Sequence, residues 1–378
     1  MARAGIGRRR AEERKQYVSE LPVWRKVTLI VGAVVLLAVL ALSLTPTGQM
    51  AVLPHAPVDL EGRVDIDRSR AERIQGRLSF IGVDDQEVRL LHKWWLEFHD
   101  DDVSFVPVPT ENRSSSSRAI ATDDPSDSNA LTLAKRVASG IAFDLAKQPV
   151  EWQGTNVAIT GIVPGSPADQ VGMQSGDSLI SINGTDINNS VDAGKMLYGR
   201  EPGSRVPVVV RRSGQDREVT LVMAPPPAGD TIHKSSIGAT LDTIGLQVGL
   251  PKTVSIDSGG VVGTSGALAF ALYVYDTVAK DDLAKGRSIV ATGALAVDGA
   301  VRPVQRLRQK AIATQRAGAD LLLVPTANVD EALAGVKEAC NSDVRCVKVV
   351  PVASVQHAVE LLNDPAKLAA VERSVNND

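Results

Sequence analysis

The chain has few aromatic residues, few cysteines and no excess of positive charge. Aromatic residues make up 3% of its 378 residues, and the formal net charge is -3. Proteins that bind nucleic acids usually carry a basic excess on one face, so this balance argues against DNA or RNA as a partner. Hydrophobic residues still amount to 44%, which is enough for the cores of two or three domains.

The two cysteines, Cys340 and Cys346, are close together near the C-terminus. No cluster of histidines and cysteines surrounds them, so we predict no metal site and no cofactor. On an oxidising side of a membrane, two cysteines so close in sequence favour a local disulfide. Such a disulfide would brace the fold and take no part in chemistry.

One long run without charged residues, VTLIVGAVVLLAVLALSL, occupies residues 27–44. At about 1.5 Å per residue, a helix of this length just spans a hydrocarbon core of about 30 Å. We therefore predict a transmembrane helix over residues 27–45, in contact with membrane lipid. A cleaved signal peptide is the alternative, because Ala41 and Ser43 are small, but the run is long for a cleavable segment.

Basic residues are nearly absent from the twenty residues after this run. Those that precede it are Arg3, Arg8, Arg9, Arg10, Arg14, Lys15, Arg25 and Lys26. The positive-inside rule then places the tail of residues 1–26 in the cytoplasm and the rest of the chain outside.

Composition divides the remainder into segments. Residues 46–130 are predicted as a membrane-proximal α+β segment with a polar, serine-rich loop over 109–129. Short apolar runs broken by turn residues predict a β-rich domain over 131–225, which a proline-rich stretch, APPPAGD, ends. Strands then alternate with helices over 232–365, as in an α/β or α+β domain, and a tail follows over 366–378.

The β-rich segment contains turn residues in a distinctive order: Ser166-Pro167-Ala168, Gly172-Met173, Gly176-Asp177 and Ile182-Asn183-Gly184. Pro167 favours the start of a short helix, and Asn183-Gly184 favours a tight hairpin turn. This order and spacing resemble bacterial PDZ domains. The resemblance implies capture of an extended peptide, often a C-terminus, as an added strand. No clear apolar-Gly-apolar signature precedes Val157, so no peptide-binding residue is assigned.

Two serines stand in the stretch IDSGGVVGTSGALAFAL, residues 256–272. Ser258 lies in DSGG, which resembles the nucleophile motif of chymotrypsin-like proteases. That fold needs a histidine base in a suitable setting and a double β-barrel, and neither is evident, so we interpret DSGG as a turn. Ser265 stands at the expected start of a helix, where backbone N–H groups and the helix dipole stabilise an oxyanion. Serine is also a favoured N-cap residue, so position alone does not make Ser265 a nucleophile.

A second stretch supports Ser265 as the nucleophile. GALAVDGAVRPVQRLRQKAIATQRAGADLLLVP resembles the proteolytic domain of Lon-type serine peptidases, and the matching positions are Gly293, Gly299, Val301, Pro303, Leu307, Lys310, Ala313, Ala317, Gly318 and Pro325. The resemblance implies that Lys310 is the catalytic base. It also implies that Ser265, forty-five residues earlier, is the nucleophile and that Thr292 supports the lysine.

The implied chemistry is that of a Ser/Lys dyad, in which a neutral amine takes the proton of the serine hydroxyl. A solvated lysine is charged at pH 7, but burial among apolar groups favours the neutral amine. The sequence contains no G-x-x-x-x-G-K-[ST], so we predict no nucleotide site and no ATP-driven motor. The substrates should then be exposed or already unfolded polypeptides.

The chain also departs from the Lon pattern. Gly263-Thr264-Ser265-Gly266-Ala267 stands where the family has Gly-Pro-Ser-Ala-Gly, and Gln305-Arg306 replace two glycines. A non-catalytic adaptor that binds peptides through the PDZ domain and retains a degenerate protease fold is therefore the alternative. A sensor that signals through the short basic tail is a weaker alternative.

Taken together, the sequence predicts a multidomain α+β protein with one N-terminal transmembrane helix, a PDZ domain and a C-terminal Lon-type α/β proteolytic domain. The predicted function is that of a membrane-anchored, extracytoplasmic serine endopeptidase with Ser265 and Lys310 as its catalytic residues. The sequence does not reveal the physiological substrate, the cleavage preference or whether the chain forms a homo-oligomer.

Overall fold

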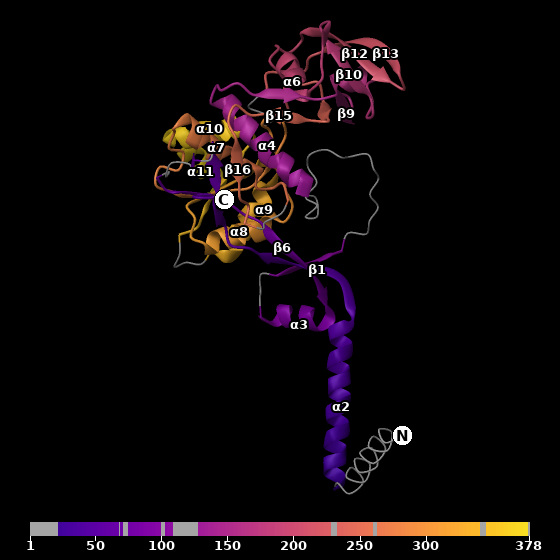
Figure 1. Ribbon diagram of the computed structural model, residues 1–378, viewed down its shortest axis with the longest axis vertical. Helices are drawn as coiled ribbons and strands as arrows, with labels where there is room; N and C mark the ends of the chain where they lie inside the picture. The colour runs from indigo at the N-terminus through magenta and orange to yellow at the C-terminus, as the bar shows by residue number, and fades with distance from the viewer. Residues whose placement is uncertain are drawn as a thin grey trace, which may run out of the picture. The chain divides into compact units, whose positions relative to one another are not determined.

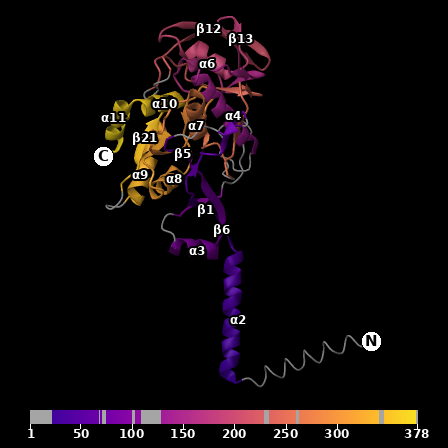
Figure 2. The ribbon, with the colours of Figure 1, turned by 60° about the vertical axis from the view of Figure 1, so that its left-hand side comes forward.

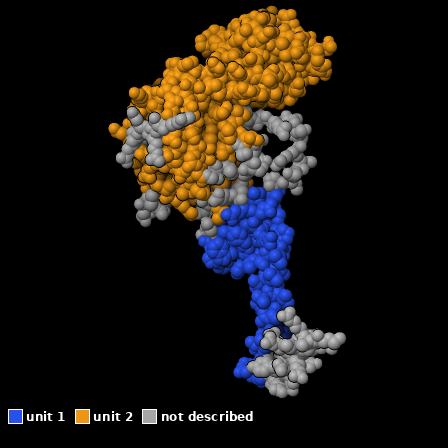
Figure 3. Space-filling model, in the orientation of Figure 1, with its two compact units in different colours: residues 1–52, 85–110 blue, residues 53–84, 111–378 orange. Residues whose placement is uncertain are grey.

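The computed structural model describes residues 22–67, 69–70, 75–99, 103–108, 128–227, 233–259, 263–340 and 345–376. Most of the basic tail and most of the polar loop predicted over 109–129 lie outside these residues. The chain forms two compact units, one of residues 1–52 and 85–110 and the other of residues 53–84 and 111–378 (Figure 3).

The first unit contains an apolar helix, α2 (Val23–Leu44), that leads directly into strand β1 (Pro46–Pro54) (Figure 1). By length and composition, α2 is able to cross a membrane. Strands β6 (Val83–Arg89) and β7 (Ser104–Pro107) flank β1 in a three-stranded sheet, and helix α3 (Leu90–His99) follows β6.

In the second unit, one sheet has the strand order β13-β12-β10-β9-β14, with β11 paired to β10. Its elements are β9 (Asn156–Ile162), α5 (Pro167–Gln170), β10 (Ser178–Ile182), β11 (Thr185–Asp186), α6 (Ser190–Tyr198), β12 (Arg205–Arg212), β13 (Gln215–Val222) and β14 (Ala239–Ile244). Alternate side chains of these strands form one apolar core, which includes Val157, Ile159, Leu179, Val208 and Leu221.

The turn chemistry expected in this sheet is present. Pro167 is the first residue of α5, and the Ser166 side chain accepts a hydrogen bond from the backbone N–H of Asp169, as an N-cap residue does. Asn183 and Gly184 both have positive φ, at 53° and 73°, between the paired strands β10 and β11. The predicted helix start and hairpin turn are therefore confirmed.

The C-terminal half of the second unit is built on a mostly parallel sheet of order β2-β5-β17-β20-β21. Its strands are β2 (Val58–Asp59), β5 (Arg77–Phe80), β17 (Ser288–Ala291), β20 (Leu321–Pro325) and β21 (Lys348–Val352). The helices around it in Figure 2 are α7 (Ala267–Ala279), α8 (Leu307–Arg316), α9 (Val329–Ala339), α10 (Val355–Asn363) and α11 (Pro365–Asn376). Shorter elements complete this half: β3 (Val64–Ile66), β4 (Ser69–Arg70), β8 (Glu151–Gln153), β15 (Gln247–Gly249), β16 (Val254–Ile256), β18 (Ala294–Leu295), β19 (Val301–Arg302) and a 3₁₀ turn, η1 (Thr326–Asn328).

Several elements from outside residues 232–365 belong to this half, among them β5 and α4. Strand β5 pairs in parallel with β17, so part of the segment predicted as membrane-proximal belongs to this sheet. Helix α4 (Ser128–Leu145) lies beside α7 in Figures 1 and 2, and both helices contribute to one apolar core. The sequence did not predict these contributions, because pairing between segments so far apart in the chain leaves no local pattern.

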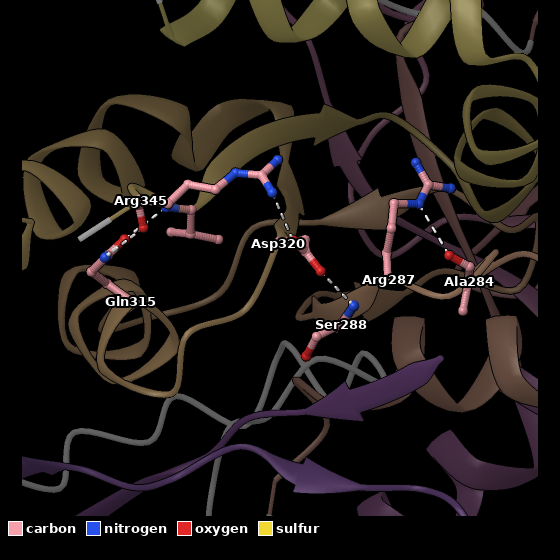
Figure 4. Close-up of polar contacts among 7 residues, drawn as sticks. Ala284, Arg287, Ser288, Gln315, Asp320 and Arg345 are labelled. Atoms are coloured by element: carbon pink, nitrogen blue, oxygen red, sulfur yellow. Dashed lines mark hydrogen bonds and ion pairs between the residues drawn. The ribbon is translucent and has the colours of Figure 1, made fainter. Parts of the chain in front are cut away.

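Polar contacts tie the strands together at the amino end of β17 (Figure 4). The Asp320 carboxylate accepts hydrogen bonds from the Ser288 backbone N–H at 2.9 Å and from Arg345 Nη1 at 3.1 Å. The disulfide expected between Cys340 and Cys346 is formed and lies in the loop between α9 and β21. These contacts join the starts of β17 and β20 and the loop that leads into β21.

Candidate active site

Ser265 lies just ahead of helix α7, in a turn that is almost fully buried. The helix begins at Ala267, and Gly266 is its N-cap residue, without a side-chain capping bond. Ser265 is therefore one residue too early to cap the helix, and the N-cap explanation of this serine is wrong. The residue is 8% exposed.

Lys310 lies in the first turn of α8 and is 3% exposed. Its Nζ donates a hydrogen bond to Thr292 Oγ1 over 3.5 Å. Thr292 follows the end of β17 and is fully buried. Its hydroxyl donates in turn to the backbone carbonyl of Ser265 over 3.3 Å. Thr292 thus contacts both candidate residues: the amine of Lys310 and the backbone carbonyl of Ser265.

Backbone hydrogen bonds fix Ser265 against the segment after β17. The Gly293 N–H donates to the Ser265 carbonyl over 2.7 Å, and the Leu268 N–H donates to the Gly293 carbonyl over 3.1 Å. A Cβ atom on Gly293 would lie 2.6 Å from Val301 Cγ1, a separation that real Cβ atoms do not show. Glycine at this position therefore allows the β18–β19 hairpin to pack close to the start of α7.

Arg306 is the N-cap residue of α8 and has a left-handed backbone, with φ of 61°. Its carbonyl accepts a hydrogen bond from the Lys310 N–H over 3.3 Å. A left-handed backbone is strained for residues other than glycine. The Lon pattern has glycine here, so the chain keeps a glycine-like backbone in spite of the substitution.

The other serine, Ser258, also lies close to a lysine. Lys135 on α4 donates from Nζ to Ser258 Oγ over 3.1 Å and to the Ile256 carbonyl over 2.9 Å. Burial lowers the pKa of Lys135, and the nearby Asp257 carboxylate opposes that shift. The chain turns here as expected, with Gly259 at φ of 61°. Sequence reasoning missed Lys135, because α4 is more than a hundred residues from this turn.

Helix α6 lies against an edge strand of the sheet built from β9, β10, β12, β13 and β14. Strand β14 stands at the end of the strand order, paired antiparallel with β9. Ile237-Gly238-Ala239, an apolar-Gly-apolar sequence, stands at the start of β14 and follows β13 in the chain. Helix α6 is tied to this strand, because the Ser190 N–H donates to Thr243 Oγ1 over 2.8 Å.

The same strand contacts the β18–β19 hairpin. The Asp242 carboxylate on β14 lies 3.7 Å from the Arg302 guanidinium on β19. Nearby, a cleft of about 810 Å³ separates α6 from α4 and this hairpin, and Trp152, Tyr198 and Asp298 are among its lining residues. Strand β14 and the segment around Gly293 therefore share one structural neighbour, the β18–β19 hairpin.

Among the described residues, no three His, Cys, Asp or Glu side chains form a group that would hold a metal ion. The Thr292 hydroxyl contacts the Ser265 carbonyl, and the Lys310 amine contacts Thr292. This arrangement suits proton transfer and nucleophilic attack.

Comparisons with known proteins identify two domains in the chain. Residues 242–362 match the family model of the Lon protease (S16) C-terminal proteolytic domain, and residues 137–222 match the PDZ domain model. The Lon protease of Campylobacter concisus is 25% identical over 228 residues, which cover 56% of this chain and 26% of that protein. The archaeal Lon protease of Halobacterium salinarum is 28% identical over 120 residues, which cover 32% of this chain and 16% of that protein.

The periplasmic pH-dependent serine endoprotease DegQ of Escherichia coli is 26% identical over 102 residues, which cover 27% of this chain and 21% of that protein. The chain spans about a third or less of the length of the curated relatives it matches. By the two family models, the chain carries a PDZ domain, which is a peptide-binding module, followed by a proteolytic domain of the Lon serine peptidase type.

Proposed function

We propose that this chain, which joins a PDZ domain to a Lon-type proteolytic domain, is a membrane-anchored serine endopeptidase that works without ATP. Its Ser265/Lys310 dyad would cleave exposed or unfolded polypeptides outside the cytoplasmic membrane. One observation carries the proposal: the buried Lys310 amine donates to Thr292, whose hydroxyl donates to the Ser265 carbonyl.

In the proposed cycle, Ser265 Oγ attacks the carbonyl carbon of a peptide bond while Lys310 Nζ accepts the hydroxyl proton. The amine then returns that proton to the leaving nitrogen, the C–N bond breaks, and an acyl-enzyme remains. A water molecule, deprotonated by the same amine, hydrolyses the ester and restores Ser265. Burial disfavours a charged amine, and Lys310 is 3% exposed, so its environment suits a base.

Negative charge on the tetrahedral intermediate needs stabilisation. Helix α7 begins two residues after Ser265, and a helix amino terminus favours negative charge through its dipole and its unpaired N–H groups. This end of α7 is therefore the proposed oxyanion site.

We propose that the PDZ domain captures substrate at the edge of β14, beside α6. An extended peptide would add as a strand to this edge, because an edge strand presents backbone groups for pairing. The turn at Gly238, with φ of 67°, would receive a C-terminal carboxylate. If so, amidation of a peptide's C-terminus weakens its binding to the Ser265→Ala chain by at least about tenfold, which corresponds to about 1.4 kcal/mol.

The proposed membrane anchor is α2, with the N-terminus in the cytoplasm. Support comes from the apolar length of α2 and from the eight basic residues ahead of residue 27. The Cys340–Cys346 disulfide is consistent with an oxidising compartment. Both catalytic residues would then lie outside the cytoplasm.

A non-catalytic peptide-binding adaptor is the second candidate. The observation that favours it is the burial of Ser265, which is 8% exposed and would have to become accessible to a substrate. In such an adaptor, the Lon-type fold would serve only as a scaffold.

The test uses the full chain in lipid nanodiscs and a fluorescently labelled, unfolded polypeptide, with no nucleotide added. We expect cleavage by the unmodified chain and no cleavage by Ser265→Ala, which should keep its affinity for peptides. An unmodified chain that binds the same polypeptide without cutting it would favour the adaptor.

A further inference from the structure

Helix α3 exposes an apolar stripe that no part of its own unit covers within the described residues. Leu90 is 42% exposed, Trp94 60%, Trp95 52% and Phe98 76%, whereas Leu96 on the opposite side is 4% exposed. Residues 90, 94 and 98 recur at helical spacing, so they lie along one side of the helix. Large aromatic side chains gathered this way mark a binding surface.

This stripe lies at the carboxyl end of the apolar helix α2. The Leu90 N–H donates to the carbonyl of Thr45, the C-cap residue of α2, over 3.1 Å. Trp94, Trp95 and Ser43 line one hollow of about 610 Å³. Figures 1 and 2 both show α3 beside this end of α2, running across its direction.

A helix that crosses the direction of a membrane span, at the end of that span, lies along the membrane surface. Tryptophan favours this level of a bilayer, because its ring is apolar and its N–H is a donor. Amphipathic helices at an interface bury their apolar side about 5–10 Å into the boundary between headgroups and acyl chains. Trp24, which is 64% exposed, stands at the other end of α2, so tryptophans bracket the apolar helix.

The polar residues of α3 suit the same position. Lys93 pairs with Glu97 over 3.4 Å and lies 5.1 Å from the centre of the Phe105 ring on β7. The cation and the carboxylate are thus held beside the small sheet of this unit. The tryptophans remain exposed.

We propose that α3 is an interfacial helix, which inserts Trp94, Trp95 and Phe98 into the headgroup boundary of the membrane that α2 spans. The lipid surface is favoured over a protein partner because the stripe is continuous with the end of α2. This inference rests on the proposed membrane anchoring. It adds a second attachment that fixes the first unit against the bilayer surface.

The test measures tryptophan fluorescence of the full chain in vesicles whose lipids carry bromine at defined depths. Trp24→Phe and Trp152→Phe leave only Trp94 and Trp95 to fluoresce. We expect blue-shifted emission, quenched at least twofold by bromines near the headgroups and less by bromines near the bilayer centre. The matched control retains only Trp152, which is 9% exposed, and should not be quenched.

Flotation of the same vesicles tests the membrane anchor separately from the interfacial helix. A chain that floats with the vesicles, but whose Trp94 and Trp95 emit as in water without quenching, contradicts the interfacial helix and leaves the anchor intact. Blue-shifted emission without quenching means that protein covers the stripe, which also contradicts it. A chain that does not float with the vesicles overturns both ideas.

Discussion

Lys310 Nζ and Thr292 Oγ1 are 3.5 Å apart in a fully buried setting, and Thr292 also donates to the backbone of Ser265. One hydroxyl therefore aligns the proposed base with the segment that carries the proposed nucleophile. Loss of this partner removes one hydrogen bond that orients the buried amine toward the Ser265 segment.

Replacing Thr292 tests this alignment. We expect Thr292→Val, which keeps the shape and removes the hydroxyl, to lower kcat by about 10- to 100-fold with little change in KM, because binding is unaffected. Thr292→Ser should restore most of the rate. Steady-state kinetics measures both parameters, and thermal denaturation verifies folding. A Val variant as fast as the unmodified chain would remove Thr292 from the mechanism.

Gly293 gives a prediction about packing. A Cβ atom there meets Val301 Cγ1 at 2.6 Å, so Gly293→Ala should destabilise the fold by about 1–3 kcal/mol and reduce activity. Val301→Ala removes the obstructing methyl groups. The double variant should therefore recover at least about 1 kcal/mol relative to the sum of the single effects, as measured by urea denaturation. Strict additivity would contradict the close contact.

Arg306 gives a prediction about backbone strain. Its left-handed φ of 61° costs roughly 1 kcal/mol for a residue with a Cβ atom. Glycine removes this strain and increases the entropy of the unfolded chain, so Arg306→Gly should be neutral or stabilising by up to about 1 kcal/mol. Arg306→Val, with a branched Cβ, should be destabilising by more than about 1 kcal/mol. Denaturation curves in which Gly is worse than Val would refute this.

Asp276 predicts how stability depends on pH. It is 1% exposed, and burial raises its pKa from 3.8 to about 6. Between about pH 4 and 6 the folded state thus holds a proton that the unfolded state has lost, so the free energy of unfolding falls as pH rises through this window. Above pH 6, the buried, ionised Asp276 carboxylate lowers the free energy of unfolding by roughly 1–3 kcal/mol.

Asp276→Asn should remove that cost. Its side-chain oxygen can still accept the Leu283 N–H, which Asp276 accepts over 2.7 Å. We expect the variant to be more stable at pH 7.5 and little changed at pH 4, as measured by denaturant unfolding at both values. A variant that gains equally at both pH values would show that ionisation of Asp276 is not the cause.

The parts of the fold that depend on neighbouring residues were predictable from the sequence. Asn183-Gly184 and Ser166-Pro167 indicate their own turn and helix start, because those conformations depend on the residues themselves. The resemblance placed Thr292 and Lys310 in one site, and the structure has them in contact.

Long-range pairing was not predictable in this way. Strand β5 joins β17 across about two hundred residues, and Lys135 reaches Ser258 from another helix. Nor did the sequence indicate that β14, the last strand of its sheet along the chain, stands at the edge of that sheet beside β9. In each case the contact depends on the assembled fold and has no counterpart in local composition.

The most direct test compares peptide-bond cleavage by four full-length chains: unmodified, Ser265→Ala, Lys310→Met and Ser258→Ala. All four are assayed on the same unfolded polypeptide, with folding verified by thermal denaturation. We predict that the first two substitutions each lower the rate by at least about 10³-fold, while Ser258→Ala stays within about tenfold. Cleavage that survives the loss of Ser265 or Lys310, or that disappears with Ser258 alone, would contradict a Ser265/Lys310 dyad.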